Sequence, residues 1–202
     1  PEESDDLEIE ANVEGHNILT HFPFDKNCPV CQNCKMQKQQ HRQTKHRGAA
    51  HDGTDFPKSF GSHITADHAI MGHGEDGRHG ERVALIIQDR FSGWLEAHPA
   101  PTKSSDEVSR AFRSYLGKHQ PSRVYTDGSK EFEAAMRSLS LPHDTSTPHR
   151  PQSNGIAEQS VRRLKEGTRC ALFQSGLSPV WWPEAARCYS FLRNVTDKVR
   201  LN

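Results

Sequence analysis

Four residues near the start of the chain have the types and spacing of a zinc site. They follow the pattern H-x4-H-x6-C-x2-C and comprise His16, His21, Cys28 and Cys31. A C-x2-C turn brings two thiolates to one tetrahedral ion, and two imidazoles complete the coordination. We therefore predict one structural Zn²⁺, although Cys34 could replace one histidine. A chance cluster in a chain with 13 histidines is the alternative.

Three carboxylates further along the chain form a second candidate site. Asp67 and Asp127 each end a predicted strand, and Glu158 lies in the first turn of a predicted helix after a loop rich in Pro, Asn and Gly. Carboxylates on separate rigid elements can hold two divalent cations about 3.5–4 Å apart, which together promote displacement at a phosphodiester. We expect two ions of Mg²⁺ or Mn²⁺ here. Taken singly, each acid is more often an exposed surface group.

The elements that must position these acids follow an α/β pattern from residue 56 onward. Continuous apolar or alternating runs predict strands, and apolar residues at helical spacing predict helices. Ser104 or Ser105 can cap the first helix. The predicted strands span 62–67, 82–88, 94–98 and 123–127, and the predicted helices span 104–119, 131–139, 156–175 and 183–194, with loops at 72–80 and 145–155.

The formal net charge of the chain is zero, but the charges are unevenly distributed along it. Lys and Arg number 26, and so do Asp and Glu. Residues 1–15 carry seven of the acids and no Lys or Arg, so the rest has 26 basic residues against 19 acidic ones. The stretch 35–47 holds five Lys or Arg and no acid, which predicts either a solvated linker or a basic arm that follows phosphates. The sequence contains no run of 18 apolar residues, so no membrane-spanning helix is expected.

In several stretches the chain resembles the integrases of retroviruses and LTR retrotransposons. The block around Glu158, with its upstream TDG-x-x-EF, is the most specific match. The matching text is GHNILTHFPFDKNCPVCQNCK, ITADH, LIIQDRFSGWLEAHPAPTKSSDEV, VYTDGSKEF, TPHRPQSNGIAEQSVRRLKEG and WWPEAARCYSFLRN.

This resemblance implies a fold and a division of the chain. The expected fold is an α/β, ribonuclease H-like core, with a mixed central sheet flanked by helices, behind a small zinc-binding helical module. The expected parts are an acidic disordered tail at 1–15, a zinc-binding HHCC-type segment at 16–40, a basic linker at 41–55 and the catalytic core at 56–202.

The resemblance also implies an activity. Asp67, Asp127 and Glu158 match the family's catalytic triad, which implies 3′-end processing and strand transfer of retroelement DNA into target DNA. Double-stranded DNA and further copies of the chain are the implied partners, and no membrane is. The implied location is the nucleus, after synthesis in the cytoplasm within a polyprotein. A ribonuclease H-like nuclease and a non-catalytic DNA-binding or assembly remnant are the alternatives.

The helix after Glu158 supports a role in DNA binding. Arg162 and Lys165 lie four and seven residues beyond Glu158, so the three share a face, and Arg169 extends it. Cations beside a catalytic acid could bind the phosphates that flank the scissile bond. An ordinary solvated face is the alternative. Three polar residues of the preceding loop could also reach DNA, namely Gln152, Ser153 and Asn154.

Overall fold

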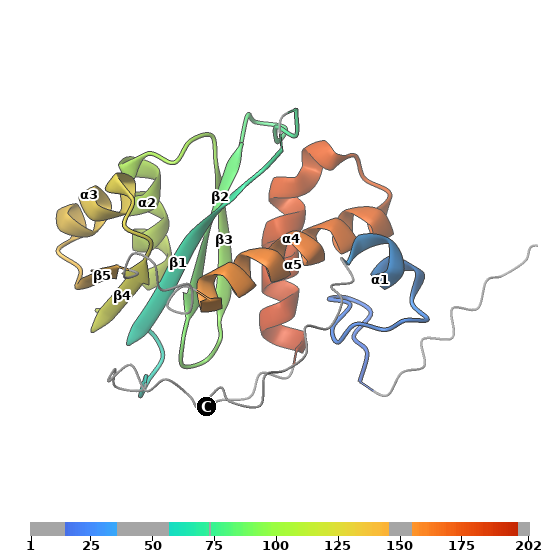
Figure 1. Ribbon diagram of the computed structural model, residues 1–202, viewed down its shortest axis with the longest axis horizontal. Helices are drawn as coiled ribbons and strands as arrows, with labels where there is room; N and C mark the ends of the chain where they lie inside the picture. The colour runs from blue at the N-terminus through green and yellow to red at the C-terminus, as the bar shows by residue number, and fades with distance from the viewer. Residues whose placement is uncertain (1–14, 36–56, 73, 146–154, 198–202) are drawn as a thin grey trace, which may run out of the picture.

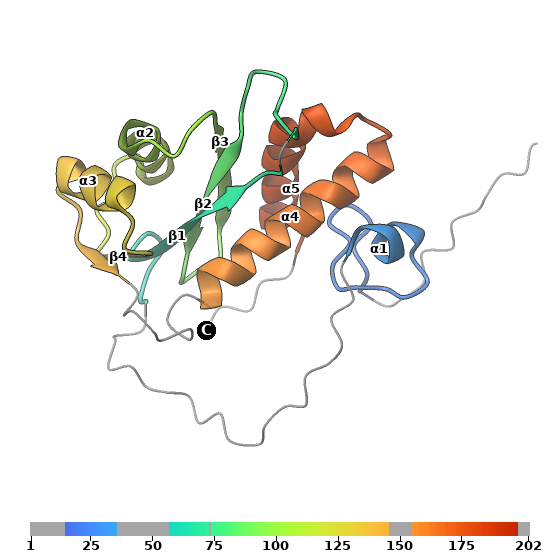
Figure 2. The same cartoon turned by 45° about the horizontal axis from the view of Figure 1, so that its top comes forward.

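The computed structural model describes residues 15–35, 57–72, 74–145 and 155–197. A twisted sheet forms its centre, with two helices on each face, and a small N-terminal module lies beside the far end of one of those helices (Figures 1 and 2). The predicted acidic tail, apart from residue 15, and the predicted basic linker at 41–55 lie outside the described residues.

Five strands form the sheet in the order β3-β2-β1-β4-β5, so β1 is the central strand. The pairs β1–β2 and β2–β3 are antiparallel, whereas β1–β4 and β4–β5 are parallel. The predicted mixed sheet is therefore confirmed. The strands are β1 (His63–Ile70), β2 (Val83–Asp89), β3 (Leu95–Ala100), β4 (Arg123–Thr126) and β5 (His143–Thr145).

Helices cover both faces of this sheet, and all four predicted helices are present. The Ser104 side chain caps the first long helix by accepting a hydrogen bond from the backbone of Glu107. No described helix has both the length and the apolar character needed to cross a membrane. The helices are α1 (Pro29–Cys34), α2 (Ser105–Leu116), α3 (Lys130–Leu139), α4 (Gly155–Ser175), η1 (Pro179–Trp181, a 3₁₀ turn) and α5 (Trp182–Thr196).

Alternation along the central strands divides the core into two layers. Leu85 and Ile87 of β2 pack in one apolar cluster with α2 and α3, whereas Ala84 and Ile86 pack in the other with α4 and α5. Successive side chains of a strand point to opposite faces, so a continuous apolar run can serve two helix layers at once. The strand predicted at 82–88 is present as β2, and it is buried on both faces.

Three predictions about the elements need correction. The strand predicted at 62–67 continues to Ile70, so Asp67 does not end it. The strand predicted at 94–98 lies at 95–100, and residues 143–145, predicted in part as loop, form β5. The antiparallel ladder with β2 keeps β1 extended, because Asp67 and the next three residues pair with β2 down to Val83.

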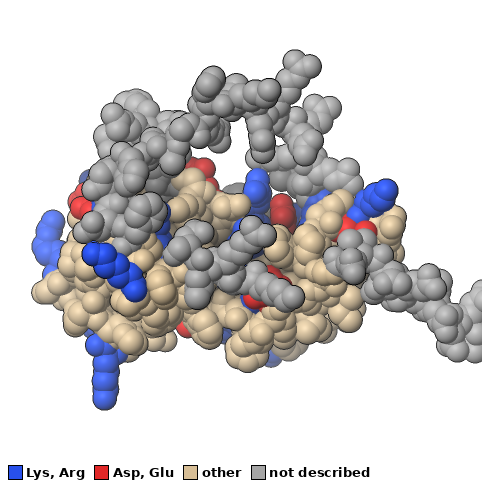
Figure 3. All heavy atoms as spheres, turned by 90° about the horizontal axis from the view of Figure 1, so that it is seen from below, with Lys and Arg blue, Asp and Glu red and all other residues tan. Residues whose placement is uncertain are grey.

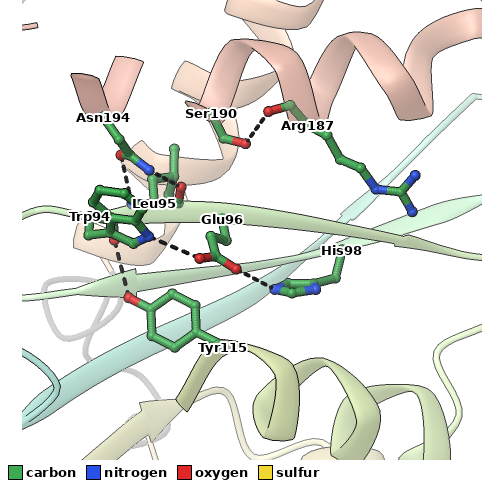
Figure 4. Close-up of polar contacts among 8 residues, drawn as sticks. All are labelled: Trp94, Leu95, Glu96, His98, Tyr115, Arg187, Ser190 and Asn194. Atoms are coloured by element: carbon green, nitrogen blue, oxygen red, sulfur yellow. Dashed lines mark hydrogen bonds and ion pairs between the residues drawn. The ribbon is translucent and has the colours of Figure 1, made fainter. Parts of the chain in front are cut away.

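Asn194 of α5 covers part of the outer edge of β3. Its amide nitrogen donates to the carbonyl of Leu95 (2.7 Å), and its amide oxygen accepts from the Leu95 backbone N–H (3.0 Å), as Figure 4 shows. One side chain thus satisfies both main-chain groups of Leu95, as a neighbouring strand would. Beside it, Glu96 accepts a hydrogen bond from Trp94 and pairs with His98, which lowers the pKa of Glu96.

A glycine permits the close approach of α4 to α5. Gly167 is buried in α4 and faces the Tyr189 ring of α5 so closely that an added Cβ would overlap the ring. Glycine in a helix interior is otherwise unfavourable relative to alanine. Close packing of the two helices therefore explains its presence here.

We expect Gly167→Ala to lower the free energy of unfolding by about 1–3 kcal/mol, because overpacking exceeds the gain in helix propensity. Chemical denaturation followed by circular dichroism would measure the change. Gly155→Ala is the matched control, since nothing lies within 4 Å of an added Cβ there. Equal stability of Gly167→Ala and the unaltered protein would contradict close α4–α5 packing.

Candidate active site and metal centre

Because side chains alternate along β1, Asp67 lies on the face of the sheet that α4 covers. Asp67 shares its strand face with Ala69, which packs in the cluster with α4 and α5. Its Oδ1 accepts a hydrogen bond from the backbone N–H of His68 (2.7 Å). The His68 side chain lies on the opposite face, with its ring 4.8 Å from that of Phe132 in α3. His68 therefore points away from Asp67.

The other two predicted acids come from separate elements. Asp127 directly follows β4, and its Oδ1 accepts a hydrogen bond from the backbone of Ser129 (3.2 Å) just before α3. Glu158 lies exposed in the first turn of α4. The loop residues Gln152, Ser153 and Asn154 lie outside the described residues.

The three acids lie close enough for their charges to interact. The pKa of Asp67 is raised chiefly by burial, and the negative charges of Asp127 and Glu158 raise it further. Asp67 and Glu158 also line one pocket of about 300 Å³. The acids do not form a tight ligand set, however. Among the described residues, only the His and Cys set below has its donor atoms all within 4.8 Å of one another.

Cations from α4 line the same pocket. Arg162, Lys165 and Arg169 all border it, as their helical spacing predicted. Two of them also make internal contacts: Lys165 donates to the carbonyl of Ile70 (2.7 Å), and Arg169 donates to the carbonyl of Cys34 (3.5 Å). On the face seen in Figure 3, Lys and Arg side chains are scattered and interspersed with acidic ones. The pocket therefore combines acids and cations.

Lys103 was not predicted as part of the site. It precedes α2, and its positive charge lowers the pKa of Asp67 while also lowering that of His68. Burial has the larger effect on His68 and brings its pKa to about 4. Nothing in the local sequence connects Lys103 with Asp67, because only the sheet brings them together.

The predicted His and Cys residues converge in the N-terminal module. The donor atoms of His16, His21, Cys28 and Cys31 all lie within 4.8 Å of one another. His21 Nδ1 is 3.4 Å from the sulfur of Cys28. A tetrahedral zinc ion with N and S ligands needs donor atoms at about this separation, since Zn–N is about 2.0 Å and Zn–S about 2.3 Å.

The second nitrogen of each imidazole is hydrogen-bonded, which suits a metal ligand. His16 Nδ1 lies 2.7 Å from the carbonyl of Pro23, and His21 Nε2 lies 3.3 Å from the side-chain oxygen of Gln174. Donation from these nitrogens leaves His16 Nε2 and His21 Nδ1 with lone pairs. His16 Nε2 is buried without a hydrogen-bond partner in the described structure. The residues therefore fit a zinc ion.

Cys34 lies outside this set of four. Its side chain hydrogen-bonds that of Cys170 in α4, and burial raises the pKa of both thiols. Cys31, within the set, also has its pKa raised, by burial first and by the neighbouring Cys28 as well. The geometry thus favours His16 over Cys34 as the fourth ligand, with Cys34 packed between the module and the core.

The module docks on the C-terminal ends of α4 and α5. Asn17 donates to Thr196 (2.7 Å) and to Asp197 (3.0 Å), and Thr20 donates to Asp197 (2.6 Å). Gln174 of α4 contacts His21, as described above. Sequence reasoning missed these residues, because contacts between residues almost 180 positions apart leave no local pattern.

Asp89, the last residue of β2, has a structural role. It is fully buried and accepts hydrogen bonds from the backbone of Gly61 (2.9 Å) and from the backbone and hydroxyl of Ser92 (2.6 and 2.7 Å). These bonds join the segment before β1 to the turn between β2 and β3. Gly61 and Ser92 both lie at this end of the sheet, and neither belongs to the acidic site.

Comparison with known proteins gives relatives of one kind. No family model matches the chain. The retrovirus-related Pol polyprotein from transposon RE1 of Arabidopsis thaliana is 28% identical over 120 residues, which is 56% of this chain and 8% of the relative. The Gag-Pol polyprotein of Koala retrovirus is 32% identical over 108 residues, which is 50% of this chain and 6% of the relative. The matched part of the chain thus spans less than a tenth of the length of each of these two relatives.

A solved structure shows the same fold. The catalytic core domain of BIV integrase superposes with a TM-score of 0.52 and 18% sequence identity, covering 69% of this chain and 88% of that one. The sheet flanked by helices is therefore the fold of a retroviral integrase core, and the predicted ribonuclease H-like class is confirmed.

We expect Asp67→Asn to raise the melting temperature at pH 7 in buffer that contains Zn²⁺ but no Mg²⁺. The folded-state pKa of Asp67 is raised, so its ionised form costs stability above that pKa and the cost disappears as the pH falls through it. The gain should therefore shrink in acid. Calorimetry at pH 7 and at pH 4 would measure both values. A variant less stable than the unaltered protein at pH 7 would contradict this electrostatic account.

Proposed function

We propose, because the chain is related to Pol polyproteins of retroviruses and retrotransposons and has an integrase-like core, that it is a DDE-type integrase. Its proposed reactions are the processing of retroelement 3′ ends and their transfer into target DNA. The observation that carries the proposal is the interaction of three carboxylates from β1, the end of β4 and α4. Such an integrase is a polynucleotidyl transferase, and it acts in the nucleus after synthesis in the cytoplasm as part of a polyprotein.

The carboxylates fit divalent cations, because they place several negative charges around the half-buried Asp67. Asp67, Asp127 and Glu158 would hold two Mg²⁺ or Mn²⁺ ions, with Asp67 as a ligand to both and Asp127 and Glu158 as a ligand to one each. The ions supply Lewis-acid activation of the attacking oxygen and stabilisation of the leaving oxygen. Arg162 and Lys165 bind the phosphates that flank the scissile bond and so fix the position of the DNA backbone.

The N-terminal module is proposed to hold one structural Zn²⁺ through His16, His21, Cys28 and Cys31. A segment of this size buries little apolar surface, and metal binding contributes about 10–16 kcal/mol to the folding of comparable zinc-finger peptides. Its docking on α4 and α5 links the metal to the catalytic core, since Gln174 of α4 contacts the ligand His21. We propose that further copies of the chain join on DNA.

Two other functions remain as alternatives. A ribonuclease H-like nuclease would use the same three acids but would cut RNA–DNA hybrids and join nothing. A non-catalytic remnant would bind DNA or assist assembly without chemistry. The set of candidate zinc ligands in front of the core favours the integrase over the nuclease, because a hydrolase core does not require it. The presence of all three acids favours the integrase over the non-catalytic remnant.

We expect Asp127→Asn to lower strand transfer by about 100-fold or more, because it removes a charged group at the reacting centre. Binding of duplex DNA should change little. Joining of labelled terminal DNA to a target duplex measures the first, and fluorescence anisotropy the second. Unchanged joining would refute the assignment of Asp127. Cleavage of an RNA–DNA hybrid without any joining by the unaltered protein would support the nuclease instead.

We expect Cys28→Ser to abolish binding of one zinc ion per chain and to lower the melting temperature, because the module loses its metal and its docking contacts with Asp197. Metal analysis and thermal circular dichroism would measure both effects. Cys188→Ser is the matched control, because Cys188 is exposed on α5 and distant in sequence from the module. Equal zinc content in the two variants would show that Cys28 is not a ligand.

A further inference from the structure

An apolar groove lies between the end of β1 and the C-terminal half of α4, and the active-site proposal does not use it. It has a volume of about 400 Å³. Ile70, Phe173 and Leu177 in its wall are 55%, 53% and 49% exposed, which is high for large apolar side chains. Met71, Leu172 and Trp182 complete the apolar lining. Exposed apolar surface that several elements share marks an interaction site.

Two cations and one acid line the groove, together with a polar group that has no hydrogen-bond partner in the described structure. The acid is Glu75, whose carboxylate accepts a hydrogen bond from the backbone N–H of Gly72 (2.8 Å). Lys165 and Arg169 line it, and both also line the pocket that contains Asp67. Thr168 lies between them in sequence and is 5% exposed, and its hydroxyl makes no hydrogen bond in the described structure. An occupant with apolar side chains and acidic groups would match the apolar wall and the two cations, and it would contact the cations proposed to bind DNA.

We propose that residues 1–14 of this same chain occupy the groove. This segment carries seven acidic residues and no Lys or Arg, and in it Leu7 and Ile9 alternate with acids in the sequence DDLEIE. The two apolar side chains fit the apolar wall, and the flanking carboxylates pair with Lys165 and Arg169. No other stretch of the chain combines such a density of acids with spaced apolar residues.

The position of the N-terminal module makes this contact attainable. The segment joins the module at residue 15, and the module packs on α4, where Arg169 of the groove rim donates to the carbonyl of Cys34. Fourteen residues reach at most about 46–50 Å when extended, which is ample on the scale of one domain. A short tether also gives an effective concentration in the millimolar range, so even a weak contact is populated.

The consequence, which depends on the proposed function, is that the acidic segment competes with DNA. Carboxylates on Lys165 and Arg169 occupy the positions that phosphates would take beside Asp67 and Glu158. Loss of the segment from the groove should therefore strengthen DNA binding. We expect about a fivefold lower Kd for duplex DNA at low salt, given a tethered competitor at millimolar effective concentration.

The test uses the full chain with a photoreactive benzophenone side chain at position 7. Irradiation without DNA, followed by peptide mass spectrometry, should give crosslinks within one chain to the segment 165–182. Crosslinks to other parts of the core, or only between two chains, would overturn the proposal, and the latter would indicate a second copy as the occupant. Because no DNA or catalysis is involved, failure of the integrase proposal would leave this result unaffected.

Variants then separate the apolar contact from the effect of charge alone. The double change Leu7→Ser and Ile9→Ser keeps every acid, and we expect it to lower the Kd for DNA about fivefold. Unchanged DNA affinity in that variant would overturn the proposal, since a purely electrostatic tail needs no groove. On the groove side, Phe173→Ser should have the same effect, whereas Phe191→Ser should have none. Phe191 is 60% exposed on α5 and does not line the groove, so it is the matched control.

Discussion

The close packing of α4 against α5 is the constraint on which the rest of the structure depends. At Gly167 the two helices approach so closely that no side chain fits between that backbone and Tyr189. The contact fixes the direction in which α4 crosses the sheet, and that direction positions residues of α4 in three functional regions. Glu158 comes to the face of β1 that bears Asp67, the cations of the middle turns border the acidic pocket, and Gln174 reaches the N-terminal module. One helix thus connects the proposed catalytic and zinc sites.

The sequence predicts the regular elements well because their signals are local. Apolar periodicity placed α4 to within one residue, and with the Ser104 cap it located the start of α2, although α2 ends three residues before the predicted end. The long apolar run identified β2. The same local signals failed where tertiary contacts decide. Asp67 was expected to end its strand, but pairing with β2 carries β1 to Ile70. The three residues of β5 have no strand pattern of their own and are held by β4.

In the candidate sites too, some residues have a local sequence signal and others are brought in only by tertiary contacts. The residue types and spacing at the His and Cys set predicted four residues that the structure brings together, because short turns join them. The acids were recognised by their setting and by resemblance, and the structure places them near one another without a tight ligand set. Lys103 and Asp197 gave no signal, because their partners are distant in sequence. The hydrogen bond from Lys165 to the carbonyl of Ile70 could not be predicted from the sequence either, since a backbone carbonyl has no sequence signature.

The amide of Asn194 also limits how copies of this chain can associate. A sheet can grow between molecules only where an edge offers unpaired main-chain groups. At the β3 edge Asn194 already occupies both groups of Leu95, and Pro99 has no N–H to donate. At the opposite edge β5 has only three residues. Within the described sheet, extension from one molecule to the next is therefore disfavoured at both edges.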